Sequence, residues 1–220
     1  MGSHICRMCY YRHPHQSMKE RPILFSGPMV RAILEGKKTQ TRRMIKRQRD
    51  MEFDINDPHF GPYWLSYATD AEGEDARVRC PYGEAGDRLW VRETWLQGQG
   101  PTWGSHCVVY DADKKIAWAP GSGFDNPDLK QFKKRPSIFM PRWASRITLE
   151  ITSVRVERLQ HISDADALAE GCSAANMRSG DSLASVYTRL WESIHGPGSW
   201  DINPWVWVVE FRKLTTTTEP

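Results

Sequence analysis

The spacing of apolar residues along the chain predicts short helices. A helix is expected over 29–35, where apolar residues recur at intervals of three and four and Gly36 follows as a stop. A second is expected over 163–170, with a serine at its N-cap, acidic residues in its first turn and Gly171 as its stop. A third is expected over 182–194, and its apolar stripe consists of Leu183, Val186, Leu190 and Ile194.

Alternation of apolar and polar residues predicts the strands. In chain order they are expected at 21–28, 88–95, 107–110, 115–118, 146–158 and 205–211. Within 146–158 the apolar positions change phase near 152–153, and one extra residue there would return both halves to the core. We therefore expect a β-bulge at that point. The segment 205–211 is nearly all apolar, so it is expected to be a central strand with both faces buried.

Strands with short helices between them predict an α+β domain, a small and partly closed β-barrel decorated by helices. The domain is expected to cover 21–213, with loop-rich insertions at about 46–80 and 97–140. Residues 1–20 are expected to be a disordered leader that begins with an expression scar, and 214–220 a disordered tail.

Composition narrows the class of protein. In 220 residues, 30 basic side chains nearly cancel 27 acidic ones, and a net charge of +3 argues against a strong nucleic-acid field over the whole surface. A local basic patch that contacts nucleic acid is still possible. The candidate is the run of Lys130, Lys133, Lys134 and Arg135, although a solvated loop would have the same composition. No apolar run reaches the ~18 residues of a membrane span. Ten tryptophans indicate either a core of large aromatics or surfaces that stack on flat ligands.

Cysteine usage favours a reducing compartment. The five cysteines are an odd number at irregular spacing, which is typical of free thiols in a cytoplasmic protein. Cys6, Cys9, His13 and His15 are residue types that bind zinc, but their spacing is cramped and no second half of a zinc ribbon follows. We therefore expect no metal and no cofactor.

The segment after Gly36 carries the candidate chemistry. Lys38, Thr41 and Arg43 follow one another closely there. A hydroxyl three residues from an amine indicates either a nucleophile beside its base or a corner that binds phosphate. In a flat strand residues 38 and 41 would face opposite sides, so the two can cooperate only if the backbone turns first.

These motifs resemble the ASCH domain, a relative of the PUA RNA-binding barrel. The resemblance lies in Gly36-x-Lys38-x-x-x-x-Arg43, in the segment 86–95 and in the segment 200–210, and it spans 21–213. One branch of that superfamily hydrolyses N4-acetylcytidine to cytidine with a Lys, a Thr and a Glu. The resemblance places these three roles on Lys38, Thr41 and Glu170 in this sequence.

The resemblance implies a role for each residue. Thr41 would attack the acyl carbonyl, and Lys38 would take its proton, which requires a neutral amine and hence a pKa several units below ~10.4. Glu170, at a helix C-terminus, would protonate the leaving amine. Arg43 or a backbone N–H after Gly36 would hold the oxyanion. Phe25, Trp95 and Trp143 are the candidate platforms for the cytosine ring.

Simpler readings of the same residues remain. Lys38 and Arg43 can bind phosphate in a non-catalytic RNA-binding module, or serve a metal-independent ribonuclease of the same fold. Thr41 can be an ordinary strand residue, and Glu170 a solvated helix end like Glu35. The expected partner is a small nucleoside, with RNA as a further possibility; no membrane is expected, and the oligomeric state stays open.

Overall fold

The computed structural model describes residues 18–46, 63–69, 75–99, 106–118 and 132–214. The expectations for 1–17, including the cysteine and histidine pairs, and for 215–220 lie outside these residues. In the part described, no helix is long and apolar enough to cross a membrane.

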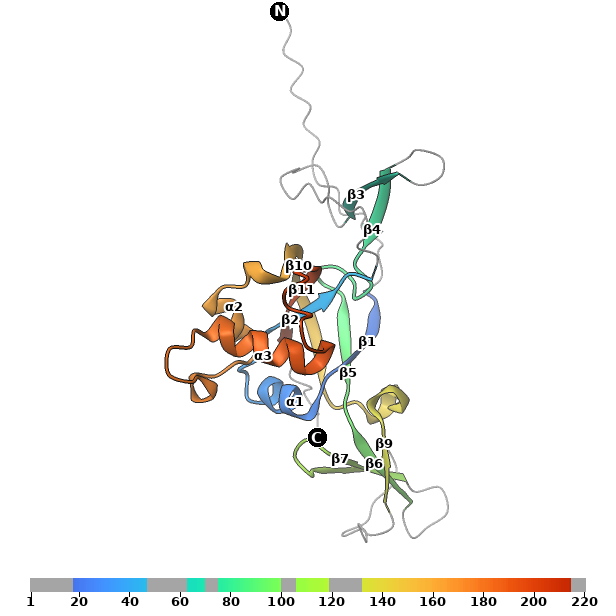
Figure 1. The fold of residues 1–220 in the computed structure, drawn as a ribbon. Coiled ribbons are helices and arrows are strands. Elements are labelled where there is room, and N and C mark those ends of the chain that lie inside the picture. The colour runs from blue at the N-terminus through green and yellow to red at the C-terminus, as the bar shows by residue number, and fades with distance from the viewer. Residues whose placement is uncertain (1–17, 47–62, 70–74, 100–105, 119–131, 215–220) are drawn as a thin grey trace, which may run out of the picture.

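A five-stranded sheet forms the centre of the fold (Figure 1). Its strands, in spatial order, are β1 (Glu20–Leu24), β5 (Arg88–Arg92), β10 (Thr148–Arg158), β11 (Trp205–Lys213) and β2 (Gln40–Met44). β1 pairs with β5 in parallel, and the remaining neighbours are antiparallel. β11 lies between β10 and β2 and has a buried residue on both faces, which confirms the central strand that its sequence predicts.

The predicted bulge is present in β10. Its pairing with β11 shifts register between Ile151 and Ser153, so an extra residue is accommodated there. Ile151 and Val156 are consequently both buried although they lie in opposite phases of the sequence. The hydrophobic pattern was sufficient to locate this irregularity because a one-residue slip would have moved half of the strand's apolar side chains into solvent.

The α-helices cover the sheet on the left in Figure 1. The α-helices are α1 (Gly27–Leu34), α2 (Asp164–Ala169) and α3 (Leu183–His195), and short 3-10 helices are η2 (Ser137–Phe139), η3 (Arg142–Ala144), η4 (Leu159–His161) and η5 (Ala174–Asn176). α3 packs Val186, Tyr187 and Trp191 against Val206 and Val208 of β11. The predicted stripe of α3 is wrong at Ile194, which is exposed, because the large rings one turn earlier take the buried face.

The two insertions contain regular structure. A second sheet has the order β8 (Ile116–Trp118), β7 (His106–Tyr110), β6 (Trp95–Gln99) and β9 (Lys133–Arg135). It confirms the predicted hairpin. Of the basic run, which could be a solvated loop, Lys133, Lys134 and Arg135 form an edge strand, and Lys130 lies outside the described residues. A further hairpin joins β3 (Tyr63–Thr69) to β4 (Asp75–Arg79). The strand expected over 88–95 divides into β5 and β6, and Glu93 between them is buried and pairs with Arg146.

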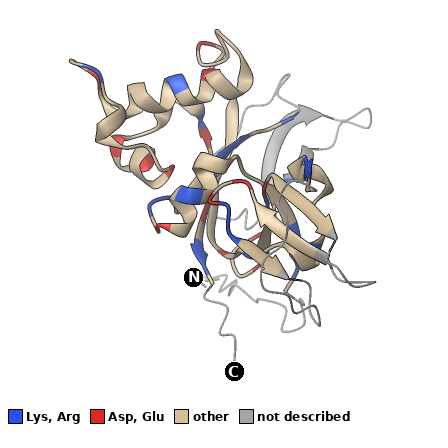
Figure 2. Ribbon diagram, turned by 90° about the horizontal axis from the view of Figure 1, so that it is seen from below, with Lys and Arg blue, Asp and Glu red and all other residues tan. Residues whose placement is uncertain are grey.

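The α+β class is confirmed, and the central sheet is only partly closed. Among the described strands no backbone ladder joins the edge strands β1 and β2; instead the Arg43 guanidinium donates to the Leu24 carbonyl at 2.5 Å. α1 connects these two strands along the chain. Figure 2 shows charges of both signs spread over strands and helices.

Candidate active site

The segment from α1 to β2 places Lys38 inside the protein. Gly36 has φ +73°, a left-handed conformation that glycine adopts without strain. The N–H groups of Lys37 and Lys38 then both donate to the Ala32 carbonyl, at 2.8 and 3.1 Å, so the chain folds back on the helix. β2 begins only at Gln40. The backbone therefore turns before the strand, which is the condition for Lys38 and Thr41 to act on one side.

The second helix brings Glu170 to Lys38. Ser163 and Asp166 form a reciprocal capping box at the start of α2, and Glu170 is its C-cap. The Lys38 ammonium donates to Glu170 Oε2 at 2.6 Å and to the Glu170 carbonyl at 2.8 Å. The Lys38 side chain is completely buried and that of Glu170 is 3% exposed, whereas Glu35, also before a glycine, is 51% exposed. Glu170 is therefore not a solvated helix end.

Burial is the largest influence on Lys38. It lowers the pKa of Lys38 from the ordinary 10.5, because an ammonium loses its hydration inside the protein. The charge and hydrogen bond of Glu170 oppose this effect, and the positive charge of Arg43 adds to it. Lys38 consequently releases its proton more readily than an exposed lysine does.

Arg42 holds the carboxylate side of the site. Its buried guanidinium lies 3.6 Å from Glu170 Oε1, 3.1 Å from Glu157 Oε2 and 3.3 Å from Asp166 Oδ2. Burial alone would raise the pKa of Asp166, but hydrogen bonds from Ser163 and the charge of Arg42 outweigh it and lower that pKa to about 2. Glu157 and Asp166 thus share the charge of Arg42 with Glu170. The contact between Arg42 and Glu170 is an ion pair without a hydrogen bond.

Thr41 and Arg43 lie on the other face of β2. In the pairing with β11 they are opposite Val209 and Trp207, whose side chains belong to the core beside Phe25. The Phe25 ring centroid is 5.8 Å from Lys38 Nζ and 5.2 Å from Arg43 Cζ, so the cations on either side of Thr41 approach one ring. Among the described residues the Thr41 hydroxyl has no hydrogen-bond partner, and none joins it to Lys38.

The structure separates the other two predicted platforms from Lys38 and Glu170. Trp95 lies on β6 and Trp143 in η3, and both line a pocket at the four-stranded sheet. That sheet is at the lower end of Figure 1, away from α2 and α3. Phe25 is therefore the one predicted aromatic side chain that the structure brings to the Lys38 corner. Within the described residues, no group of His, Cys, Asp or Glu could hold a metal ion.

Sequence reasoning did not identify Tyr187 as part of this environment. It is buried on α3, with the Arg42 guanidinium 6.0 Å from its ring. Burial raises the pKa of Tyr187 well above 10, and the negative charge of Glu170 adds to the effect. Tyr187 is thus a neutral hydroxyl near the carboxylate. Helical spacing marks it as a candidate for burial but gives no sign of its neighbours, which come from β2 and α2.

Gly171 provides a test of how tightly the Lys38 corner is packed. A Cβ added there would lie 3.3 Å from Lys38 Cβ and 3.2 Å from Ala32 Cβ, at φ +91°. Gly180 has a similar φ of +85° with nothing within 4 Å, so it is a matched control for backbone strain. We expect Gly171→Ala to lower the free energy of unfolding by about 1–3 kcal/mol more than Gly180→Ala does, as overpacking costs. Urea unfolding of both variants measures this, and equal losses would contradict the packing described here.

Comparison with known proteins concerns the fold. No family model and no curated protein matches the sequence. The chain is similar to an ASCH domain from Lactobacillus crispatus JV V101, with 11% identity, 89% of this chain and 79% of that chain covered, and a TM-score of 0.39. It is also similar to protein EF3133 from Enterococcus faecalis V583, of family model DUF984, with 11% identity, coverage of 92% and 86%, and a TM-score of 0.37. One of these two solved structures is therefore an ASCH domain, the family that the sequence motifs resemble.

Proposed function

We propose that the chain is a metal-independent amidohydrolase that releases the acyl group of N4-acylated cytosine nucleosides. The observation that carries the proposal is the buried Lys38–Glu170 hydrogen bond of 2.6 Å at the start of the strand that holds Thr41. An amine of lowered pKa, a carboxyl group in contact with it and a hydroxyl without a partner are the groups that amide hydrolysis requires.

In the first half of the reaction, neutral Lys38 takes the proton of Thr41 while Oγ1 forms a bond to the acyl carbonyl carbon. Arg43, on the same face of β2 as Thr41, is the proposed donor to the oxyanion. The proton passes from Lys38 across its hydrogen bond to the Glu170 carboxylate, which donates it to N4 as the C–N bond breaks. Cytidine leaves, and the acyl group stays on Thr41 as an ester.

In the second half, water attacks the ester. Lys38 takes a proton from this water and returns one to Thr41 Oγ1 as the carboxylic acid leaves. Phe25, which both cations approach, is the proposed contact for the cytosine ring.

Cys80, Cys107 and Cys172 are free thiols, and this supports the further proposal of a cytoplasmic setting.

The phosphate-binding alternatives have less support at this corner. The Lys38 ammonium is buried and already donates to two oxygens of Glu170. An RNA-binding module or a ribonuclease that held a phosphate with Lys38 would therefore have to break both of these contacts first.

Incubation of the purified chain with N4-acetylcytidine tests the proposal. We expect the ultraviolet spectrum to change to that of cytidine, in the presence of a chelator as in its absence. N4-propionylcytidine and N4-benzoylcytidine extend the assay to larger acyl groups. No turnover of any of the three compounds would overturn the proposal, and degradation of added RNA instead would favour the ribonuclease.

A further inference from the structure

A second candidate site lies on the four-stranded sheet. Trp95 and Gln97 of β6 are directly opposite Arg135 and Lys133 of β9 in the register of the pair. Residues opposite each other in an antiparallel pair point to the same face, so these four side chains share one face of the sheet. β9 is an edge strand of that sheet, and its three residues are exposed.

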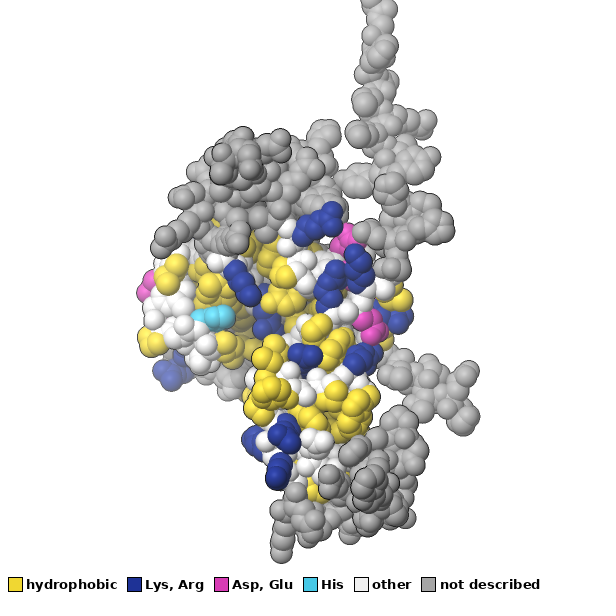
Figure 3. Space-filling view, turned by 90° about the vertical axis from the view of Figure 1, so that its right-hand side faces the viewer, with side chains coloured by type: hydrophobic (Ala, Val, Ile, Leu, Met, Phe, Trp, Pro, Cys, Tyr) yellow, Lys and Arg dark blue, Asp and Glu magenta, His cyan; other side chains and the backbone are white. Residues whose placement is uncertain are grey.

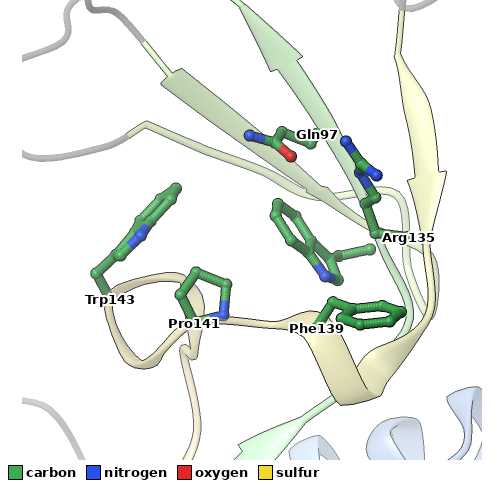
Figure 4. Close-up of a pocket in the computed structure, with 6 residues that line it drawn as sticks. Gln97, Arg135, Phe139, Pro141 and Trp143 are labelled. Atoms are coloured by element: carbon green, nitrogen blue, oxygen red, sulfur yellow. The ribbon is translucent and has the colours of Figure 1, made fainter.

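Aromatic side chains from the following turns complete a pocket on this face. Trp95, Gln97 and Arg135 line it together with Phe139, Pro141 and Trp143, around a volume of about 400 Å³. Figure 4 shows Phe139 and Trp143 on opposite sides of Pro141, with Gln97 and Arg135 across from them. Phe139 is 69% exposed and Trp143 47% exposed. Two exposed rings that line one pocket form an apolar patch, and such patches often mark binding sites.

Polar groups in the pocket lack partners. Trp95 is 3% exposed, and its buried Nε1–H has no hydrogen-bond partner. The Nε1 atom lies beneath the surface, so it does not face the open volume. No described residue bonds to the amide of Gln97, which lines the pocket. The pocket thus combines flat apolar faces with one amide that is free to bond to a ligand.

The adjoining edge carries positive charge that the described residues do not neutralise. Lys134, on the opposite face of β9, pairs with Asp111 at 2.9 Å. Lys133 and Arg135 have no acidic partner in the described part of the chain. They lie two positions apart in the strand, a rise of about 6.6 Å, which is roughly the advance of one nucleotide in an extended single strand. On the face in Figure 3, basic and hydrophobic side chains gather while few acidic ones are visible.

We propose that this face binds single-stranded nucleic acid, with a base in the Trp143–Phe139 pocket and phosphates on Lys133 and Arg135. Base stacking on aromatic side chains beside a basic track is the ordinary mode of such binding. The site is separate from Lys38 and Glu170, so it goes beyond the proposed hydrolase. An acidic peptide would pair with the cations but would not supply a flat ring to stack on Phe139 and Trp143. In a duplex the bases are already paired and stacked, so none could enter the pocket.

Fluorescence anisotropy with labelled short oligouridine and oligoadenosine tests the proposal on the full chain. Trp143→Ala should weaken binding by about 5- to 150-fold, the range expected for one lost base stack. Arg135→Ala should weaken binding and lower the slope of log affinity against log salt by about 0.7, the value for one phosphate contact on a single strand. A labelled ligand is preferable to protein fluorescence because the chain has ten tryptophans.

Matched variants distinguish binding at this site from non-specific binding elsewhere on the surface. Ile202→Ala removes another exposed apolar side chain, and Lys115→Ala another exposed cation; both should bind like the wild type. Lys37→Met, which changes an exposed lysine next to Lys38, should also retain binding. Equal affinity for duplex, full competition by polyglutamate, or a loss with Lys37→Met but not with Trp143→Ala would overturn the proposal. Because oligonucleotides without acyl groups are used, the result is independent of whether hydrolysis occurs.

Discussion

Lys38→Met should lower turnover of N4-acetylcytidine by about 100- to 10,000-fold, the usual contribution of a general base. It should also lower the free energy of unfolding by about 3–5 kcal/mol. Both effects follow from the same contact, since the amine donates to Glu170 Oε2 and to the Glu170 carbonyl inside the protein. Methionine fills a similar volume but leaves the buried carboxylate without this partner. Initial rates and urea unfolding measure the two losses.

A double variant separates catalysis from stability. Lys38→Met with Glu170→Leu removes both members of the pair, so most of the lost free energy of unfolding should return while turnover stays absent. Lys37→Met is the matched control, because Lys37 is exposed and pairs only with exposed Glu35 among the described residues. It should change neither quantity. Turnover that returns with stability in the double variant would show that Lys38 has a structural role alone.

Thr41→Val should abolish turnover and leave stability unchanged or slightly raised. Valine keeps the shape of threonine but has no nucleophile. The Thr41 side chain is buried, and no described residue makes a hydrogen bond with its hydroxyl, so the exchange breaks no contact. Initial rates and urea unfolding again measure the effects.

Two substitutions control for the change at Thr41. Thr41→Ser retains a hydroxyl on the same strand and should retain measurable turnover. Thr39→Val alters the exposed threonine two residues earlier and should have no effect on rate. Wild-type rates in Thr41→Val would remove Thr41 as the nucleophile and leave direct attack by water, with Lys38 as its base.

Local rules were sufficient for much of this fold. Gly36 and Gly171 both have positive φ and end helices where the sequence places stops. Ser163 caps α2, and the phase change in β10 marks its bulge. Each of these features depends on neighbours within a few residues, and a sequence records such neighbours directly.

Features that depend on distant segments were not predictable in this way. β9 joins β6 across a long stretch of chain, so its basic residues looked like a solvated loop. Trp95 and Trp143 meet at that sheet and not at Lys38, which residue type alone does not reveal. The contacts of Arg42 with Glu157 and Asp166 also join separate elements. The Lys38–Glu170 contact was anticipated only through the resemblance to a known family, which carries long-range information that periodicity lacks.

The pH dependence of kcat/KM for N4-acetylcytidine tests most directly whether an uncharged Lys38 does the chemistry. Burial lowers the pKa of Lys38 below 10.5, and only the neutral amine can accept the Thr41 proton. Rates should therefore rise with pH and level off with a midpoint below 10.5, and they should be lost as the pH falls and the amine becomes protonated. A rate that is independent of pH, or that declines as the pH is raised from neutrality, would contradict the account.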